Sequence, residues 1–489
     1  MKKSISLFLL FSILIFSCKT ANEEEVEALS IATLESAFDT YKEPQITDRR
    51  FKHSDLQPLI KKHEGAFKIE ELGKSVEGRS ISSLDWGEGE TKVLLWSQMH
   101  GNESTATMSL FDLFNFLEAE NDEFDELRNT LRQRLSIKFI PMLNPDGAEE
   151  FKRRNALDID LNRDAVSQIS PEAIILKGTR DSFEPEFGFN LHDQQIYYNV
   201  GDTPKQATIS VLAPAYNEER DNNEVRMRAM QTIVGMNRIL QQLIPGQVGQ
   251  YNDSFEPRAF GDNIQKWGTS TILIESGGYF GDPEKQYIRE LNFIIILNAL
   301  HQIATESYVQ YTEEEYFDIP DNSIKLVDLI LHELTVPLNG QDFQLDLAIR
   351  RREVNSGDSY YVNGVVDDLG DVQTYFGMEE LDATGYRIKE GEIFSQSFEN
   401  VDDIDEAEAL ELLRQGFLAV KAENFEEGQL HGLPILVLGS GEEFDSGWQL
   451  GETPTFLLEK DGSIEYAVVN GYLIDLKEPK DQSFNQVVY

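Results

Sequence analysis

The chain has 489 residues, of which 87 are acidic and 43 are basic, and its formal net charge at pH 7 is −44. A body this acidic repels phosphate backbones, so we expect no nucleic-acid partner. Hydrophobic residues make up 40% of the chain and aromatic residues 10%, which allows a large core and excludes global disorder. The single cysteine excludes an intramolecular disulfide and a cysteine-based metal cluster.

The first 18 residues have the pattern of an export signal. Two lysines precede the apolar stretch 5–16, which is too short to cross a bilayer, since a spanning helix needs about 20 residues. The stretch ends at Ser17 and Cys18 and resembles a bacterial lipoprotein signal, in which the cysteine is lipidated and becomes the mature N-terminus. The resemblance implies an exported protein that is anchored by lipid on Cys18 to the bacterial envelope, at its periplasmic face or at the cell surface. An ordinary secretory signal is the alternative.

The next part of the chain is predicted to be a tether followed by an α/β domain. Residues 19–50 are acidic and lack sustained periodicity, which suggests a tether with a short helix. From 51 to 310, apolar runs typical of strands alternate with helical patterns, which predicts a mixed, partly parallel sheet flanked by helices. The expected strands are 93–96, 135–143, 187–191 and 271–274, and the expected helices run through 106–117, 227–244 and 284–305.

The acidic, proline-containing stretch 312–321 marks a predicted domain boundary. Residues 318–489 are predicted to be mostly β, because apolar and polar residues alternate at 343–349 and because 456–469 has the pattern of a hairpin. One helix is expected at 406–415. Two roles are open for this accessory domain: binding of cell wall or glycan, or packing against the first domain.

Side chains with metal and acid–base chemistry stand at the ends of the predicted strands. His100 and Glu103 follow the strand 93–96, and His192 directly follows 187–191. Imidazole nitrogens and a carboxylate suit zinc, and three protein ligands leave one position open for water. Glu275 ends the apolar strand 271–274, where a carboxylate is costly unless it is paired or used.

Arginines lie between these segments in the sequence. Arg153 and Arg154 follow the turn Asn144-Pro145-Asp146-Gly147, and Arg163 stands in the stretch Asp160-Leu161-Asn162-Arg163. A guanidinium near a metal can bind an oxyanion or a carboxylate with two parallel hydrogen bonds.

In this order the segments resemble the zinc carboxypeptidase family of funnel-shaped metallopeptidases. The resemblance begins at Gly73-Lys74-Ser75 and Gly78-Arg79 and ends at Glu275, so it covers roughly half of the chain. It implies one zinc ion per chain, bound by His100, Glu103 and His192. It also implies an exopeptidase that removes C-terminal residues from extracytoplasmic peptides.

The resemblance also implies roles for the other groups. Glu275 would act as the general base and then protonate the leaving amine. Arg153 would stabilise the oxyanion, with Arg154 as the competing choice. Asn162 and Arg163 would bind the substrate's terminal carboxylate.

Two departures from the family pattern concern the substrate. Family members often carry a tyrosine that closes over the substrate; the nearest one here is Tyr251, which we assign to substrate binding without a firm alignment. Asp164 stands where many relatives have asparagine, and its carboxylate is expected to weaken the affinity of Arg163 for a C-terminus.

Two other functions compete with the peptidase. One keeps the zinc and changes the bond, as in an amidase on cell-wall peptides or a deacylase of N-acyl amino acids. The other is a non-catalytic surface binding protein on a peptidase scaffold. The presence of all three metal-binding candidates and of Glu275 argues against the latter.

Overall fold

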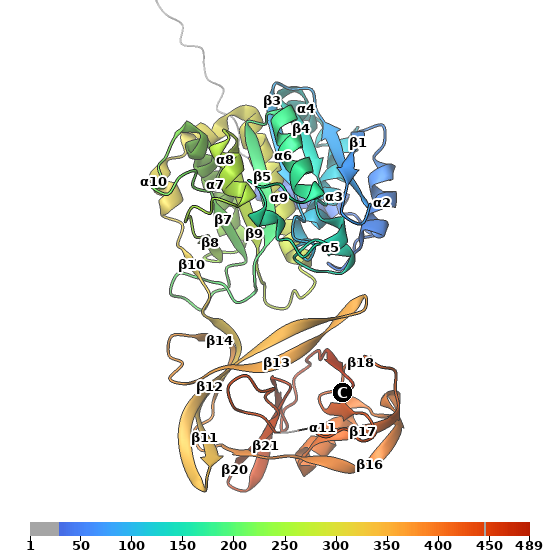
Figure 1. Cartoon of the computed structure of the whole chain (residues 1–489). Helices are drawn as coiled ribbons and strands as arrows, with labels where there is room; N and C mark the ends of the chain where they lie inside the picture. The colour runs from blue at the N-terminus through green and yellow to red at the C-terminus, as the bar shows by residue number, and fades with distance from the viewer. Residues whose placement is uncertain (1–28, 445) are drawn as a thin grey trace, which may run out of the picture.

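The computed structural model describes residues 29–444 and 446–489, so the predicted signal, Cys18 and the first part of the tether lie outside the described residues. An α/β domain is followed by a β-rich domain, as Figure 1 shows. Within the described ranges, no helix combines the length and the apolar character needed to cross a bilayer.

The α/β domain is built on an eight-stranded sheet with the order β1-β2-β4-β3-β5-β9-β7-β8. The neighbours β4, β3, β5 and β9 run parallel, whereas the pairs β1–β2, β2–β4 and β7–β9 are antiparallel. The predicted mixed, partly parallel sheet is therefore confirmed. The strands are β1 (Lys68–Lys74), β2 (Ser80–Trp86), β3 (Thr91–Trp96), β4 (Leu135–Ile140), β5 (Phe187–Asp193), β7 (Ile209–Leu212), β8 (Val248–Gln250) and β9 (Ser270–Ser276).

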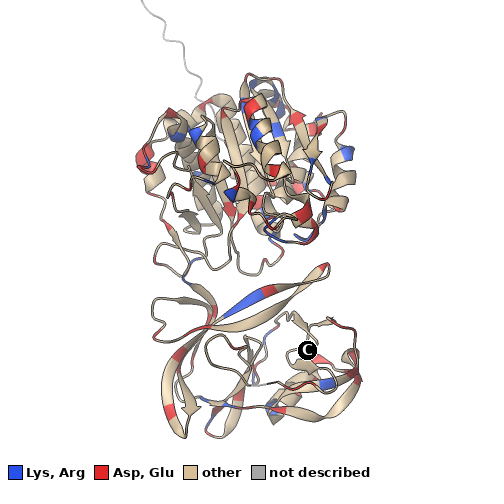
Figure 2. Ribbon diagram, viewed as in Figure 1, with Lys and Arg blue, Asp and Glu red and all other residues tan. Residues whose placement is uncertain are grey.

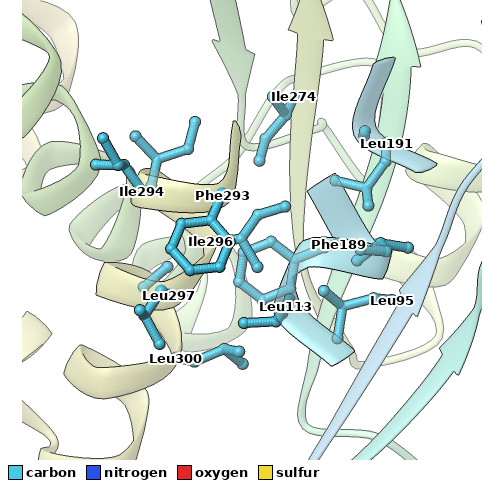
Figure 3. Packing of buried hydrophobic residues seen from close by; sticks show 14 of the residues in the cluster. Leu95, Leu113, Phe189, Leu191, Ile274, Phe293, Ile294, Ile296, Leu297 and Leu300 are labelled. Atoms are coloured by element: carbon cyan, nitrogen blue, oxygen red, sulfur yellow. The ribbon is translucent and has the colours of Figure 1, made fainter. Parts of the chain in front are cut away.

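Helices cover both faces of this sheet because the central strands are apolar on both faces. In β3, Val93 and Leu95 belong to one core cluster, and Leu94 and Trp96 to the cluster on the other face. The first cluster contains α3 and α9 and is seen at close range in Figure 3, where Leu95, Leu113 and Phe189 meet the α9 side chains. The helices are α2 (His53–Lys62), α3 (Thr105–Glu118), α4 (Asp125–Arg134), α6 (Pro171–Phe183), α7 (Glu224–Leu243), α8 (Phe260–Lys266) and α9 (Gln286–Thr305).

The segment predicted to be a tether is part of this domain from residue 31 onward. Helix α1 (Ile31–Tyr41) buries Leu34 and Phe38 in the same core as α9. Behind it, the fully buried Arg289 donates to the carbonyl oxygens of Glu43, at 3.0 Å, and of Ile46, at 2.6 Å. The tether prediction is thus wrong for residues 31–50, because a few large apolar side chains and backbone carbonyls suffice to dock the segment.

The boundary between the domains lies slightly beyond the predicted one. Tyr316 in α10 (Glu313–Phe317) is fully buried, and its hydroxyl accepts a hydrogen bond from the backbone N–H of Ala213 at 3.0 Å. Next, β10 (Asn322–Ser323) pairs with β6 (Asn199–Val200), so the β-rich domain begins after residue 323.

The β-rich domain contains a second eight-stranded sheet, a three-stranded sheet and α11 (Glu406–Gln415). The predicted strand 343–349 is only the first half of β12, which runs on to Ser356. The strands of the large sheet are β11 (Leu326–Leu338), β12 (Gln341–Ser356), β13 (Ser359–Gly370), β14 (Phe376–Asp382), β15 (Arg387–Lys389), β20 (Phe456–Lys460), β21 (Ser463–Val469) and β22 (Tyr472–Asp475). The three-stranded sheet contains β16 (Glu392–Asn400), β17 (Phe417–Asn424) and β19 (Leu436–Leu438).

Candidate active site

A cleft of about 970 Å³ opens at the carboxyl ends of β3, β5 and β9. The chain leaves β3 to form β4 on one side and returns to form β5 on the other, and ligands bind open α/β sheets at such switch points. His192 of β5 and Glu275 of β9 are register partners, so their side chains stand on the same face of the sheet. His100 and Glu103 follow β3 and line the same cleft.

The three metal-binding candidates converge on one point. One Glu103 oxygen lies 2.8 Å from His100 Nδ1, and the other lies 2.7 Å from His192 Nδ1. The two Nδ1 atoms are 3.1 Å apart. Among the described residues, these three form the one cluster of at least three potential ligands whose donor atoms all lie within 4.8 Å of one another.

The ionisable groups of this cluster shift in different directions. Burial works against protonation of His100, but the carboxylates of Glu103 and Asp160 raise its pKa. Burial lowers the pKa of His192, which favours the neutral imidazole that metals bind. Burial works against ionisation of Glu103, but the two neighbouring imidazoles hold its pKa well below the usual range. Two nitrogen donors and one ionised carboxylate are a ligand set of catalytic zinc sites, so the residues present fit this metal.

Asp160 completes the site, although it was not singled out in the sequence. Its carboxylate lies 3.1 Å from His100 Nε2 and accepts from Arg153 Nε at 3.2 Å. A carboxylate on the far ring nitrogen fixes the tautomer and leaves Nδ1 free for the metal. The sequence did contain a signal for Asp160, because this residue begins the Asp-Leu-Asn-Arg stretch that carries part of the family resemblance.

Glu103 is held in place by further residues around Asp193. The backbone N–H of Asp193 donates to Glu103 at 3.1 Å, and the Asp193 carboxylate accepts from Thr105, at 2.5 Å, and from Lys285, at 2.9 Å. Lys285 comes from the loop before α9, and nothing in its sequence context separates it from a surface lysine.

Glu275 is a buried carboxyl group that lines the cleft. Burial, with the charges of Glu103 and Asp193 nearby, raises its pKa well above the usual range. A carboxyl group with a raised pKa binds a proton more readily than an ordinary carboxylate, which suits a general base that later acts as an acid.

Arg153, rather than Arg154, lines the cleft. Its Nη1 lies 3.0 Å from Glu103 and 3.1 Å from His100 Nδ1, so a guanidinium cation stands directly beside the metal ligands. Arg154 instead donates to the backbone carbonyl of Asp158 at 2.9 Å.

The predicted substrate-binding residues Asn162, Arg163 and Tyr251 also line the cleft. Asn162 accepts from the backbone N–H of Phe260 at 2.9 Å. The Tyr251 hydroxyl lies 3.4 Å from that of Tyr198, and burial, with the charge of Glu275, raises its pKa. The structure thus brings every site residue predicted from the described part of the chain to one cleft.

Asp164 does not pair with Arg163, which corrects the expectation from the sequence. Its buried carboxylate accepts from the backbone N–H groups of Ile169 and Ser170, at 2.9 and 2.8 Å, and therefore stabilises a loop. The carboxylate beside Arg163 belongs to Glu256, 3.5 Å from Nε.

Two motifs prove to be structural supports for the site. Asp146 accepts from Ser75, at 2.7 Å, and from Arg79, at 2.8 Å, which ties the Gly-Lys-Ser and Gly-Arg stretch to the turn after β4. That turn is the short helix α5 (Pro145–Glu149), capped by Asn144, which also donates to the carbonyl of Met99 next to His100.

Residues 53–240 match the family described as zinc carboxypeptidase, which confirms the resemblance of the sequence motifs. This match ends before Tyr251 and Glu275, so the assignment of those two residues rests on the geometry of the cleft.

The relatives cover parts of the chain. An uncharacterized protein of Zymomonas mobilis is 30% identical over 168 residues, which are 34% of this chain and 42% of that protein. Carboxypeptidase D of Homo sapiens is 25% identical over 199 residues, 34% of this chain and 14% of the relative. The chain therefore spans less than half the length of these curated relatives.

Among solved structures, a metallo-carboxypeptidase from Burkholderia cenocepacia aligns at 19% identity and a TM-score of 0.40, over 53% of this chain and 70% of that one. The range that matches the zinc carboxypeptidase family, residues 53–240, contains all three members of the ligand cluster.

Proposed function

We propose that the protein is a zinc-dependent metallocarboxypeptidase that removes C-terminal residues from peptides. The observation that carries this proposal is the convergence of the His100–Glu103–His192 cluster with Glu275 and Arg163 in one cleft. Exopeptidase chemistry needs residues that bind the metal, a group that carries a proton and a cation that binds the substrate's carboxylate.

Bound zinc would supply a Lewis acid that polarises the scissile carbonyl and lowers the pKa of water. Glu275 takes a proton from the attacking water and delivers it to the leaving amine. Arg153 donates hydrogen bonds to the carbonyl oxygen as negative charge develops there. Asn162 and Arg163 orient the substrate by its terminal carboxylate, and Tyr251 closes the cleft on the other side.

One feature favours the zinc amidase over the carboxypeptidase. Glu256 lies 3.5 Å from Arg163, and its charge reduces the attraction of this arginine for a free carboxylate. An enzyme that cleaves an amide within a cell-wall peptide would have less use for such attraction. The deacylase gains nothing from this feature, because an N-acyl amino acid also presents a free carboxylate.

Paired substrates separate the two candidates. We would measure kcat/KM of the zinc-loaded protein for peptides with a free C-terminal carboxylate and for the same peptides amidated at the C-terminus. A carboxypeptidase strongly prefers the free carboxylate, whereas equal rates favour the amidase. The absence of hydrolysis in both series, with zinc bound, would leave the deacylase and the non-catalytic binding protein, which hydrolysis of N-acyl amino acids would separate.

We further propose that the chain is exported and anchored to the envelope membrane through lipid on Cys18. The support is the sequence alone, in which the only cysteine ends the apolar stretch 5–16. Cys18→Ala is expected to release the protein from membranes or to block processing of the signal. Unchanged processing and membrane partition would contradict this assignment.

A further inference from the structure

The β-rich domain contributes one wall of the cleft. β11 pairs with β12 from Gln341 to Ile349, and beyond this point β12 continues paired with β13 as a hairpin that extends from the sheet toward the α/β domain (Figure 1). We call residues 350–366 the cleft hairpin. Its residues Arg350, Arg351, Arg352 and Glu353 line the cleft together with the metal ligands.

Contacts from three segments fix the cleft hairpin against the α/β domain. The Tyr197 hydroxyl, four residues beyond β5, lies 2.7 Å from Asp328 and 2.6 Å from the carbonyl oxygen of Arg351. Arg50 lies between the rings of Phe151 and Tyr360, with its guanidinium carbon 4.0 and 4.4 Å from the ring centres.

Asn355 adds backbone contacts near the tip of the hairpin. Its side-chain amide donates to the carbonyl oxygens of Glu150, at 3.3 Å, and Phe151, at 3.1 Å. Glu353 forms ion pairs with Arg49 and Arg50 of the segment before α2. With these contacts the hairpin is a fixed part of the cleft wall.

The hairpin carries more positive than negative charge. Asp367 is shared between Arg350, at 3.2 Å, and Arg352, at 3.3 Å, so one carboxylate faces two guanidinium groups. Arg351 is balanced by Asp328 at 3.2 Å. The Arg352 side chain is 63% exposed, so part of its hydrogen-bonding capacity faces the open cleft. Figure 2 shows this basic stretch as a blue segment of the hairpin.

The cleft differs in charge from the rest of the chain. Acidic residues outnumber basic ones 87 to 43 in the whole sequence, but the cleft is lined by seven arginines and lysines against six carboxylates, two of which are the metal ligand Glu103 and Glu275. The lining is thus close to charge balance within an acidic body, and an anionic ligand meets less repulsion in the cleft than elsewhere on the chain.

We propose that the cleft hairpin is a cationic subsite that selects peptides with an aspartate or glutamate on the N-terminal side of the scissile bond. This inference rests on the proposed carboxypeptidase function, which sets the direction of the peptide. Asn162 and Arg163 line another border of the cleft, where they contact the segment 256–260 instead of the cleft hairpin. We therefore place the C-terminus of the peptide at that border, with its N-terminal side extending along the cleft toward Arg352.

The subsite should act through charge, and its effect should depend on ionic strength. An ion pair to a partly exposed arginine favours binding by roughly threefold to tenfold in low salt. Exposed charges are screened beyond about 10 Å at 0.1 M salt, so the preference should shrink when the salt concentration rises.

Binding of three matched peptides tests the proposal without relying on turnover. The peptides carry a neutral fluorophore and differ at one position, three residues before the C-terminus, which is glutamate, glutamine or lysine. Their Kd is measured by fluorescence anisotropy with the zinc-loaded full chain carrying Glu275→Gln, so that no peptide is consumed. We expect affinity to fall in the order glutamate, glutamine, lysine, with about threefold to tenfold between the first two.

Arg352→Gln should reduce the glutamate-to-glutamine ratio to less than twofold, and Arg352→Lys should retain most of it. Arg387→Gln is the matched control, because Arg387 is a half-exposed arginine of the same sheet that pairs with Asp342 outside the cleft lining. Equal Kd values for the three peptides, or a ratio that persists in Arg352→Gln, would overturn the subsite.

The same peptides separate this inference from the proposed function. If the protein with Glu275 intact hydrolyses none of them, yet the Arg352-dependent preference is measured, the carboxypeptidase activity is wrong and the cationic subsite stands. If all three are hydrolysed and bound equally well, the activity stands and the subsite is wrong.

Discussion

The α/β domain and the β-rich domain reach the cleft through different structural elements. The α/β domain brings His100, His192 and Glu275 there at the ends of parallel strands. The β-rich domain brings Arg352 there on a hairpin that extends beyond its own sheet. The register of the parallel strands fixes the positions of His100, His192 and Glu275. The cleft hairpin belongs to another sheet, so its side chains can change without disturbing these three. In our proposals the α/β domain carries the chemistry and binds the substrate's terminus, and the β-rich domain adds a preference for residues farther along the peptide.

The largest effect is expected when one of the metal-binding side chains of the α/β domain is removed. His192→Ala removes one of three zinc donors, so we expect loss of bound zinc and a fall in activity of roughly 10⁴-fold or more. Elemental analysis of the purified protein measures the zinc, and His301→Ala in α9 is the matched histidine control that should retain it. Full zinc occupancy in His192→Ala would contradict the assignment.

Glu275→Gln separates metal binding from proton transfer. The amide has nearly the same shape but cannot accept the proton, so we expect zinc and fold to be retained and kcat to fall by about 10²–10⁴-fold. Zinc content, circular dichroism and kcat are measured on the same sample. A kcat close to that of the unmodified protein would exclude Glu275 as the general base.

Arg163→Ala tests how the substrate's terminus is bound. A charge-assisted pair is worth about 1.5–3 kcal/mol, so kcat/KM for free-carboxylate peptides should fall roughly 10–150-fold, whereas amidated peptides should be affected little. Equal losses in both series would assign Arg163 to the fold or to the transition state.

Glu256→Gln sharpens this test, because it removes the negative charge 3.5 Å from Arg163. We expect the preference for a free carboxylate over an amide to rise by a few-fold, since exposed pairs contribute up to about 1 kcal/mol. The ratio of the two kcat/KM values measures this preference. A falling ratio would mean that Glu256 orients Arg163 instead of competing for it.

A separate prediction concerns the stability of the β-rich domain at low pH. Burial lowers the pKa of His431 to about 4, below the usual value of about 6.5, so the unfolded chain binds a proton more readily than the folded one between these pH values. Stability should therefore fall by about 2–3 kcal/mol from this residue as the pH drops from 6.5 to 4. Urea unfolding at both pH values measures the loss.

His431→Gln removes this group and should make the pH dependence of unfolding shallower. His332→Gln is the control, since His332 is an exposed histidine of the same domain. Identical pH dependence in the unmodified protein and in His431→Gln would show that the folded state accommodates the charged imidazole.

The sequence predicted most of the α/β domain because parallel strands place their polar end residues at one edge of the sheet. His192 and Glu275 were found in this way. The sequence did not predict Lys285 or Arg352, because a lysine in a loop and an arginine in an exposed strand look alike whether or not they face a cleft. The docking of 31–50 was missed because its carbonyls, which carry no sequence signal, accept the hydrogen bonds from Arg289.

The segment between α1 and α2 has a consequence for proteolysis. Its carbonyl groups are bound by the buried Arg289, and a few residues later Arg49 and Arg50 pair with Glu353 of the cleft hairpin. A protease that cut between residues 43 and 49 would separate these two attachments. It would release the N-terminal part of the chain from the core and loosen the hairpin at the cleft in a single event. Resistance of this segment to a protease that cleaves before aspartate, at Asp48, therefore reports whether both domains are correctly assembled.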